Sequence, residues 1–339
     1  MLINFFIAIS LGLVFCFIFR KLSKDIGLVD IPDGVRKTHT GKIPLGGGLS
    51  ICFTYFICSL IFVEFNSFFF VLLVATPLLL VIGLLDDFSP LPVFVRLIAQ
   101  IILSWAVIIF TDVYVKDLGN LFGVGSIYLG QLGIPITIFM VVGVCNAFNM
   151  LDGMDGFVSV VSFIAISCLS VISYINNVDF SWAIALSGAL IAFFIFNVGL
   201  IGRRFQMFLG DSGAMMIGFF IAWILVFYSQ EPQKIISPVY AIWIIILPLI
   251  DALSAFYRRL RSKEKIFLGD RKHIHYILLD SGYKKINALL IFVYISLVSC
   301  LTVILASLFL VEDYYLFYGF LTLWFFYLLT FKYPNQKKK

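Results

Sequence analysis

The chain has 339 residues, of which 62% are hydrophobic and only 13% are charged, and its formal net charge at pH 7 is +5. Soluble domains carry about 25% charged residues, so this composition excludes an arrangement of soluble domains and predicts an integral membrane protein. All six cysteines lie in apolar segments and none forms a CxxC pair, which excludes a disulfide or zinc framework.

The apolar segments predict the fold class. Eleven of them are long enough to cross a hydrocarbon core of about 30 Å, so we expect an all-α polytopic membrane protein of about eleven transmembrane helices, in a single domain over residues 1–339. The first segment has no basic residue before it and no cleavage motif after it, which favours a span over a cleaved signal. In chain order the segments cover residues 2–20, 46–63, 68–85, 93–111, 132–149, 157–175, 181–199, 213–229, 236–257, 286–310 and 314–331.

The basic residues predict the orientation of these spans. Alternate connecting segments hold 22 of the 24 lysine and arginine residues, and Lys116 and Lys234 are the two on the opposite side. Cytoplasmic loops are enriched in Lys and Arg, so we expect the N-terminus outside and the C-terminus in the cytoplasm. No motif for nucleic acid is present. The basic segments are 20–45, 86–96, 200–212, 258–285 and the tail from Lys332. The loop over residues 147–156 is predicted on the same side, although it contains no Lys or Arg.

The first predicted cytoplasmic loop ends in a glycine triplet, residues 46–48. Free helix N-terminal amides beside basic side chains would suit an anion. Close packing of a second helix against the glycines is the alternative. The basic side chains concerned are Arg36, Lys37, His39 and Lys42.

The third apolar segment ends in two adjacent carboxylates, Asp86 and Asp87. Adjacent carboxylates repel each other, which raises the pKa of one of them unless a cation compensates. Arg96, nine residues further on, or a Mg²⁺ ion could supply that charge. The alternative is a solvated loop.

The predicted outer loop over residues 112–131 is longer than the other outer loops. Two partly alternating segments flank Gly123-Val124-Gly125. This pattern predicts a small β-hairpin on the outer surface with a structural role.

The stretch Asn146–Gly156 interrupts two apolar segments with two amides and two carboxylates. If the preceding helix continues, Asn149, Asp152 and Asp155 share one face. Such a cluster at the edge of a lipid-embedded core is costly unless it binds something. Carboxylates with nearby amides suit a hard cation or a polar ligand rich in hydroxyl and imide groups. The alternative is a polar connecting loop with glycine turns.

Three further polar features lie in the second half of the chain. Asp211 directly precedes an apolar segment and suits either a helix N-cap or a Mg²⁺ ligand. Asp251 lies within the ninth apolar segment, where a carboxylate either has a function or is satisfied by a neighbouring helix. The large basic cytoplasmic loop 258–285 contains His273 and His275 among nine Lys and Arg residues.

The two histidines favour a phosphate ligand over a metal. At positions i and i+2 they share a face of a strand but not of a helix. Neighbouring cations would repel a zinc ion, whereas basic residues beside histidine suit a diphosphate. Positive-inside anchoring explains the arginines of this loop equally well but not the histidines.

Together these motifs resemble the polyprenyl-phosphate N-acetylhexosamine-1-phosphate transferases, of the glycosyltransferase family 4 type, and most closely their bacterial branch that transfers N-acetylglucosamine 1-phosphate. Several motifs in family order are specific, although each alone would be weak. They run from residue 27 to residue 276, and they are GLVDIPDGVRKTHTGKIPLGGG, GLLDD, YVKDLGNLFG, NAFNMLDGMDG, IGRRFQMFLGDSG, AIWIIILPLID with YRRLR, and DRKHIHY.

The resemblance implies roles for individual residues. It places Asp86, Asp87, Asp152, Asp155 and His273 in catalysis. It places Asp211, with Asp87, at a magnesium ion. It assigns substrate binding to Lys42, Arg96, Asn146, Asn149, Phe208, Arg271 and His275.

This chain departs from the family pattern at two places. Tyr276 stands where the family motif usually has a final histidine, and tyrosine carries no positive charge at pH 7. Val93 and Phe94 are apolar where a basic residue often follows the aspartate pair, which leaves Arg96. The role of each of these positions is therefore open.

The resemblance also implies an activity. We expect transfer of N-acetylglucosamine 1-phosphate from UDP-N-acetylglucosamine to undecaprenyl phosphate with release of UMP, dependent on Mg²⁺, for which Mn²⁺ could substitute. The site would face the cytoplasm at the bacterial inner membrane, in the first step of O-antigen or other surface-polysaccharide synthesis. Another UDP-N-acetylhexosamine or a phospho-muramoyl-pentapeptide is the alternative donor group. A transporter of lipid-linked sugars is disfavoured because the acids gather at one face and no repeat is visible. A homodimer is left open.

Overall fold

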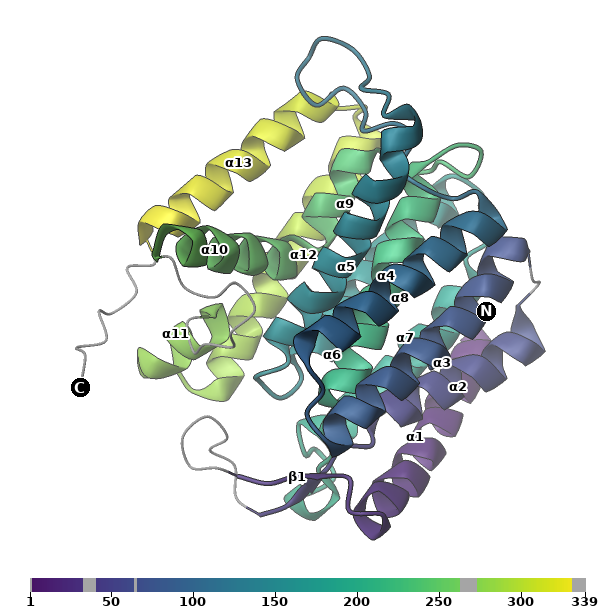
Figure 1. Cartoon of the computed structure of the whole chain (residues 1–339), viewed down its shortest axis with the longest axis vertical. Coiled ribbons are helices and arrows are strands. Elements are labelled where there is room, and N and C mark those ends of the chain that lie inside the picture. The colour runs from purple at the N-terminus through teal and green to yellow at the C-terminus, as the bar shows by residue number, and fades with distance from the viewer. Residues whose placement is uncertain (1, 33–40, 64–65, 263–272, 331–339) are drawn as a thin grey trace.

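The computed structural model describes residues 2–32, 41–63, 66–262 and 273–330. Within these ranges the chain is a bundle of helices, as predicted, and its longest connection follows α4 (Figure 1). The helices are α1 (Leu2–Asp25), α2 (Gly47–Phe62), α3 (Ser67–Phe88), α4 (Val93–Thr111), α5 (Gly133–Leu151), α6 (Phe157–Ile175), α7 (Ser181–Asn197), α8 (Gly210–Ser229), α9 (Pro238–Ile244), α10 (Ile246–Ser262), α11 (Ile274–Asp280), α12 (Lys285–Leu308) and α13 (Asp313–Thr330).

Every predicted apolar segment forms a helix, and the ninth forms two. α9 and α10 meet at Ile245 and are bent by 86°, so α10 runs across the bundle (Figure 1). Within the described residues, seven helices are long and apolar enough to cross a membrane, or eight if this bent pair is one span. Judged by helix length and hydropathy, this number is smaller than the eleven spans predicted. α2 and α7 have only 16 and 17 residues, about 24–26 Å of helix.

α8 is the central helix of the bundle. Its apolar residues continue on all sides, the pattern of a fully buried helix, and every residue of its span window is buried. It packs against α3 and α5 along most of its length, and also contacts α2, α6 and α9. By contrast, only 22% of the corresponding window of α4 is buried, so α4 lies at the periphery of the bundle. The N-terminus of α8 is therefore positioned by several helices at once.

The glycine triplet serves close packing. The amides of Gly47 and Gly48 donate to the carbonyls of Phe208 (3.0 Å) and Leu209 (3.1 Å), so these two amides already have acceptors. A Cβ on Gly48 would lie 2.7 Å from Cα of Gly213 in α8. The structure thus supports packing over an anion site at these two amides.

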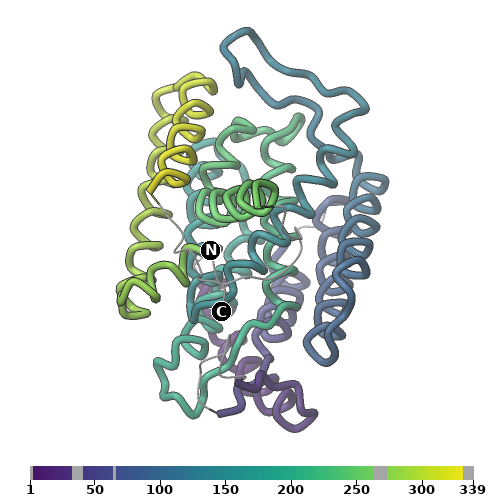
Figure 2. The backbone as a smooth tube through the Cα atoms, turned by 60° about the vertical axis from the view of Figure 1, so that its left-hand side comes forward, coloured from purple at the N-terminus to yellow at the C-terminus, as the bar shows by residue number. Residues whose placement is uncertain are grey.

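Two short pairings lie outside the helices. β1 (Val29–Asp30) and β2 (Ile43–Pro44) form an antiparallel pair that the sequence did not predict. The hairpin expected over 112–131 is reduced to one bridge, Asp117 with Tyr128, flanked by three backbone hydrogen bonds. This loop extends from one end of the bundle, and β1 lies at the other (Figures 1 and 2).

Close contact between α3 and α8 makes a stability prediction. A Cβ on Gly83 would overlap Cα of Ser212, so Gly83→Ala should force the two helices apart and cost about 1–3 kcal/mol. The matched control is Gly143→Ala in α5, where a Cβ meets nothing within 4 Å. Thermal unfolding in detergent should show a lower midpoint for the first variant alone. Equal midpoints for the two variants would contradict the contact.

Candidate active site

The site is organised by a contact between the last turn of α3 and the N-terminus of α8. Asp87 Oδ1 accepts the backbone N–H of Asp211 at 2.9 Å. Asp87 Oδ2 accepts the Ser212 hydroxyl at 2.6 Å and the Ser212 N–H at 3.3 Å. The first N–H groups of a helix have no partner within the helix, and a carboxylate there also interacts favourably with the helix dipole. Asp87 therefore caps α8 from another helix.

A glycine makes this approach feasible. Gly210 has φ +80°, and a Cβ there would lie 2.5 Å from Asp87 Oδ2. Only a residue without a Cβ fits both the backbone conformation and the space. The FLGDSG segment is thus needed for geometry as well as for its carboxylate.

Arg96 of α4 binds carboxylates of both α3 and α8 at this point. Its Nη1 donates to Asp86 Oδ2 at 2.7 Å and to Asp211 Oδ2 at 3.2 Å. Asp86 Oδ1 accepts the N–H of Leu91 at 2.7 Å. The Asp86 side chain is 6% exposed and that of Asp211 is 47% exposed. Of the predicted aspartate pair, Arg96 therefore compensates Asp86, and Asp211 is the carboxylate open to a ligand.

Asp211 does not act as the N-cap of α8. The cap position is Leu209, which makes no side-chain cap hydrogen bond, and Asp211 lies in the first turn. The N-cap alternative is thus wrong, and Asp87 performs the capping.

The loop between α5 and α6 brings a second set of polar groups to the same place. The Asn149 side-chain amide lies within interaction distance of the Asp211 carboxyl. Burial raises the pKa of Asp152 well above its usual range, and the neighbouring Asp211 and Asp87 carboxylates raise it further. Asp152 therefore belongs to the cluster around the α8 N-terminus.

The conditional prediction of one shared helix face is wrong for Asp155. α5 ends at Leu151, and Asp152 is its C-cap residue with non-helical φ and ψ. Asp155 instead accepts a hydrogen bond from Lys285 Nζ at 2.9 Å, at the start of α12. Lys285 has no sequence motif that would have indicated this role.

Asn146 contacts α4. Its Nδ2 donates to Gln100 Oε1 at 2.9 Å and to the carbonyl of Val142 at 2.7 Å. In the described structure it is thus part of the packing between α4 and α5. Its substrate-binding role stays a prediction.

The two histidines form a pair beside the α5–α6 loop. Their rings are parallel, with centroids 6.0 Å apart and an interplanar angle of 4°. The two rings lie on the same side of the backbone although His275 is in α11, because His273 precedes that helix in an extended conformation. The fully buried His275 ring fills the space where a Cβ of Gly153 would be. Tyr276 packs against His275 at 4.1 Å between centroids.

The remaining predicted residues are less informative. Lys42 is exposed and directly precedes β2. Phe208 is half-buried, and its backbone joins Pro44 to Gly47. Arg271 lies outside the described residues. Their assignments stay predictions.

The carboxylates fit a magnesium ion of the kind that shares its coordination with a substrate. Within the described residues no three His, Cys, Asp or Glu side chains form a ready-made metal site. Mg²⁺ commonly uses one or two carboxylates and completes its shell with water and phosphate oxygens. Asp211, half-exposed and near Asp152, fits this pattern. Asp87 fits it less well, because both of its oxygens accept hydrogen bonds from α8.

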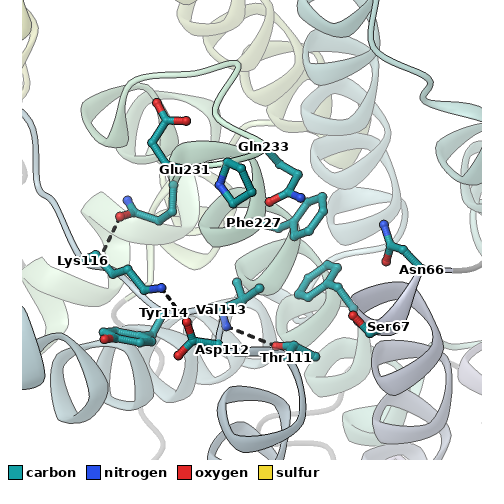
Figure 3. A pocket seen from close by; sticks show the side chains of 13 residues that line it. Asn66, Ser67, Thr111, Asp112, Val113, Tyr114, Lys116, Phe227, Glu231 and Gln233 are labelled. Atoms are coloured by element: carbon teal, nitrogen blue, oxygen red, sulfur yellow. Dashed lines mark hydrogen bonds and ion pairs between the residues drawn. The ribbon is translucent and has the colours of Figure 1, made fainter.

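A cavity of about 230 Å³ lies elsewhere (Figure 3). It contains none of the predicted site residues and lies at the N-terminal end of α3, about 30 Å of helix from Asp87. It is lined by Asn66, Ser67, Phe68, Thr111, Asp112, Val113, Tyr114, Lys116, Phe227, Gln230, Glu231, Pro232 and Gln233.

Comparison with known proteins gives a consistent result. Residues 69–229 match the model of glycosyl transferase family 4. The chain is 35% identical over 307 residues to the undecaprenyl-phosphate alpha-N-acetylglucosaminyl 1-phosphate transferase of Escherichia coli (strain K12), covering 89% of this chain and 81% of that protein. Proteins of the same name from Yersinia pestis and Haemophilus influenzae are 34% and 32% identical, covering 86% and 92% of this chain and 79% and 89% of theirs.

The raised pKa of Asp152 predicts a pH-dependent stability. A carboxyl whose pKa is raised by folding loses stability as the pH rises through that pKa. In metal-free buffer, Asp152→Asn should therefore unfold at a higher temperature than the wild type at pH 8. Near pH about 4, where the wild-type carboxyl is protonated, the difference should vanish. Thermal scans across this range measure it.

Asp155→Asn is the matched control. It removes an ion pair with Lys285, so it should give no gain at pH 8. A wild-type unfolding temperature equal to or above that of Asp152→Asn at pH 8 would contradict the assigned environment.

Proposed function

The chain belongs to glycosyl transferase family 4, and from this membership we propose that it transfers N-acetylglucosamine 1-phosphate from UDP-N-acetylglucosamine to undecaprenyl phosphate and releases UMP. The observation that carries this proposal is the 32–35% identity, over most of the chain, to transferases of that name. The cluster of Asp86, Asp87, Asp152 and Asp211 with Arg96 at one end of an apolar bundle supports it.

A membrane setting suits this pair of substrates. We propose eleven spans, with an outer N-terminus and a cytoplasmic site at the bacterial inner membrane, and a product that enters O-antigen or other surface-polysaccharide synthesis. The distribution of 22 of 24 basic residues supports the orientation. The soluble polyanionic donor would then meet a basic face, and the acceptor phosphate would reach the same level from the lipid.

Positioning and charge neutralisation are the main needs of phosphoryl transfer. A phosphate monoester has a second pKa near about 6, so the acceptor is largely dianionic at pH 7 and needs no strong base. We propose direct attack on the donor diphosphate. Asp86 is fixed by Arg96 and by the N–H of Leu91, which suits a group that orients the acceptor or takes a residual proton.

The polar groups around the α8 N-terminus divide the remaining work. Asp211 would hold Mg²⁺ with help from Asp152, and the Asn149 amide beside Asp211 would contact the nucleotide-sugar. When bound, Mg²⁺ or Mn²⁺ would neutralise diphosphate charge and stabilise the leaving UMP. Arg96 fixes the Asp211 carboxylate, and Asp87 fixes the backbone that carries it.

UMP release tests the proposed reaction. The purified protein should release UMP with UDP-N-acetylglucosamine, undecaprenyl phosphate and Mg²⁺ together, and omission of any one should abolish release. Release with another UDP-sugar alone would keep the mechanism and change the donor. Silence from folded protein with every UDP-sugar would remove the transferase and favour a lipid-linked sugar transporter.

Two aspartate variants separate metal binding from helix capping. Asp211→Asn should lose activity on the order of 100-fold and regain part of it at raised Mg²⁺, because the amide remains a weak ligand. Asp87→Asn should lose at least as much without such recovery, because an NH₂ group would face the donors of Ser212. Equal recovery of both variants by Mg²⁺ would contradict this division of roles.

A further inference from the structure

A buried amide of α4 forms a polar layer with side chains of α5 and α8. Gln100 is 0% exposed, although only 22% of the apolar window of its helix is buried. Its Oε1 accepts Nδ2 of Asn146 at 2.9 Å, and its Nε2 faces Sδ of Met215 at 3.3 Å. Burying an amide is costly unless it is hydrogen-bonded, and a thioether is a weak acceptor. Packing between helices alone therefore does not explain an amide at this position.

This polar layer lies one helical turn below the carboxylate cluster. Gln100 follows Arg96 by four residues in α4, and Asn146 precedes Asn149 by three residues in α5. Residues three or four apart share one face of a helix, about 5–6 Å from each other. Arg96 donates to Asp211, and Asn149 lies within interaction distance of the same carboxyl. The layer is therefore the floor beneath the groups that face the proposed substrates.

A backbone carbonyl fixes the direction of the hydrogen bonds in the layer. Asn146 Nδ2 donates to the carbonyl oxygen of Val142 at 2.7 Å as well as to Gln100 Oε1. A carbonyl oxygen can only accept, so the nitrogen of the Asn146 amide must face it, and both hydrogens of that nitrogen are used. In the described part of the chain, Asn146 forms hydrogen bonds through Nδ2 alone. Its Oδ1 is the atom left for a ligand, and this atom can only accept.

An acceptor at this position discriminates among the groups of the proposed substrates. The phosphate oxygens of the diphosphate and of the largely dianionic lipid phosphate are themselves acceptors, so an amide oxygen would repel them. The hydroxyl and N–H groups of the sugar and of the nucleoside are donors. Both kinds of donor belong to the nucleotide-sugar, because the polyprenyl chain carries none.

We propose that Gln100 is a positioning residue: it holds the Asn146 side chain so that Oδ1 accepts a hydrogen bond from a hydroxyl or N–H group of the nucleotide-sugar. This inference rests on the proposed function. An unrestrained asparagine amide can turn and present either its oxygen or its nitrogen. Here the turned amide would place its oxygen against the carbonyl of Val142 and against Gln100 Oε1. The contact contributes to binding, and no covalent bond changes at either residue.

Met215 supplies a matched control for this proposal. Gln100→Met keeps a similar volume and removes the acceptor that holds Asn146. Met215→Leu removes the sulfur beside Gln100 Nε2 and leaves the bond between Gln100 and Asn146 in place. Both variants disturb the same buried layer, so both should lower the unfolding temperature. Only Gln100→Met should change the binding of the nucleotide-sugar.

Calorimetry at saturating Mg²⁺, without the lipid acceptor, measures the contact. Gln100→Met should bind UDP-N-acetylglucosamine about 3- to 10-fold more weakly than the wild type, the contribution of one neutral hydrogen bond. Asn146→Ala should lose at least as much. Addition of Gln100→Met to Asn146→Ala should have no further effect, because two residues that act through one contact are not additive. Met215→Leu should bind as tightly as the wild type.

Binding of UMP identifies the source of the donor group. If Gln100→Met weakens UMP and UDP-N-acetylglucosamine equally, the group belongs to the nucleoside. If it weakens UDP-N-acetylglucosamine alone, the group belongs to the sugar. Either result supports the inference. In the steady state KM for UDP-N-acetylglucosamine should rise with little change in kcat, the signature of a lost contact that is equal in the ground state and the transition state.

The outcomes separate this inference from the proposed function. Wild-type affinity of Gln100→Met for both ligands at saturating Mg²⁺ would overturn the inference alone, even if the variant needed more Mg²⁺, since Oδ1 would then serve water bound to the ion. An equal loss of affinity in Met215→Leu would show a structural role and also overturn it. A folded wild type that binds neither ligand would overturn the proposed function, and the positioning role would fail with it.

Discussion

The hydrogen bonds from the α8 N-terminus to Asp87 are the constraint on which the rest of the site depends. The apolar span of α8 is fully buried, and its first N–H groups, which have no acceptor within the helix, need a group that reaches them from outside it. Asp87 does so from the end of α3, where Gly83 and Gly210 allow the two backbones to approach. This arrangement places Asp211 at a fixed position facing Arg96.

Around this fixed point, groups from distant parts of the chain have separate tasks. Arg96 balances part of the negative charge, and the α5–α6 loop adds Asn149 and Asp152. The cluster keeps more carboxylates than Arg96 alone neutralises, which is why it suits a divalent cation and a polyanionic substrate together. Beyond it, the bend between α9 and α10 brings Asp251 under the histidines. The site therefore depends on helix ends and breaks, and the helix interiors supply the scaffold.

Much of the fold could be predicted from the length of the apolar segments alone, because a helix in lipid must form all the hydrogen bonds of its backbone within itself. The bend at Ile245 was not predicted, although Pro248 lacks the N–H that would bond the carbonyl of Ile244 four residues earlier, and its ring crowds that carbonyl. The polar interruptions predicted Asp152 and Asp211 as neighbours of a site. The capping role of Asp87, the Asp155–Lys285 pair and the Asp251–His273 pair needed tertiary structure, since their partners are 124, 130 and 22 residues away along the chain. The glycine triplet was ambiguous because packing and anion binding use the same residue type.

The central claim is that the carboxylates at the α3–α8 contact form one cation site centred on Asp211. The most direct measurement is a crystal structure of the protein soaked with Mn²⁺ and UMP, with anomalous differences recorded at the manganese edge. The account predicts one peak within bonding distance of a carboxylate oxygen of Asp211, on the side facing the α5–α6 loop. A peak bound instead at Asp155, after displacement of Lys285, or crystals of active protein without any peak near Asp211, would contradict it.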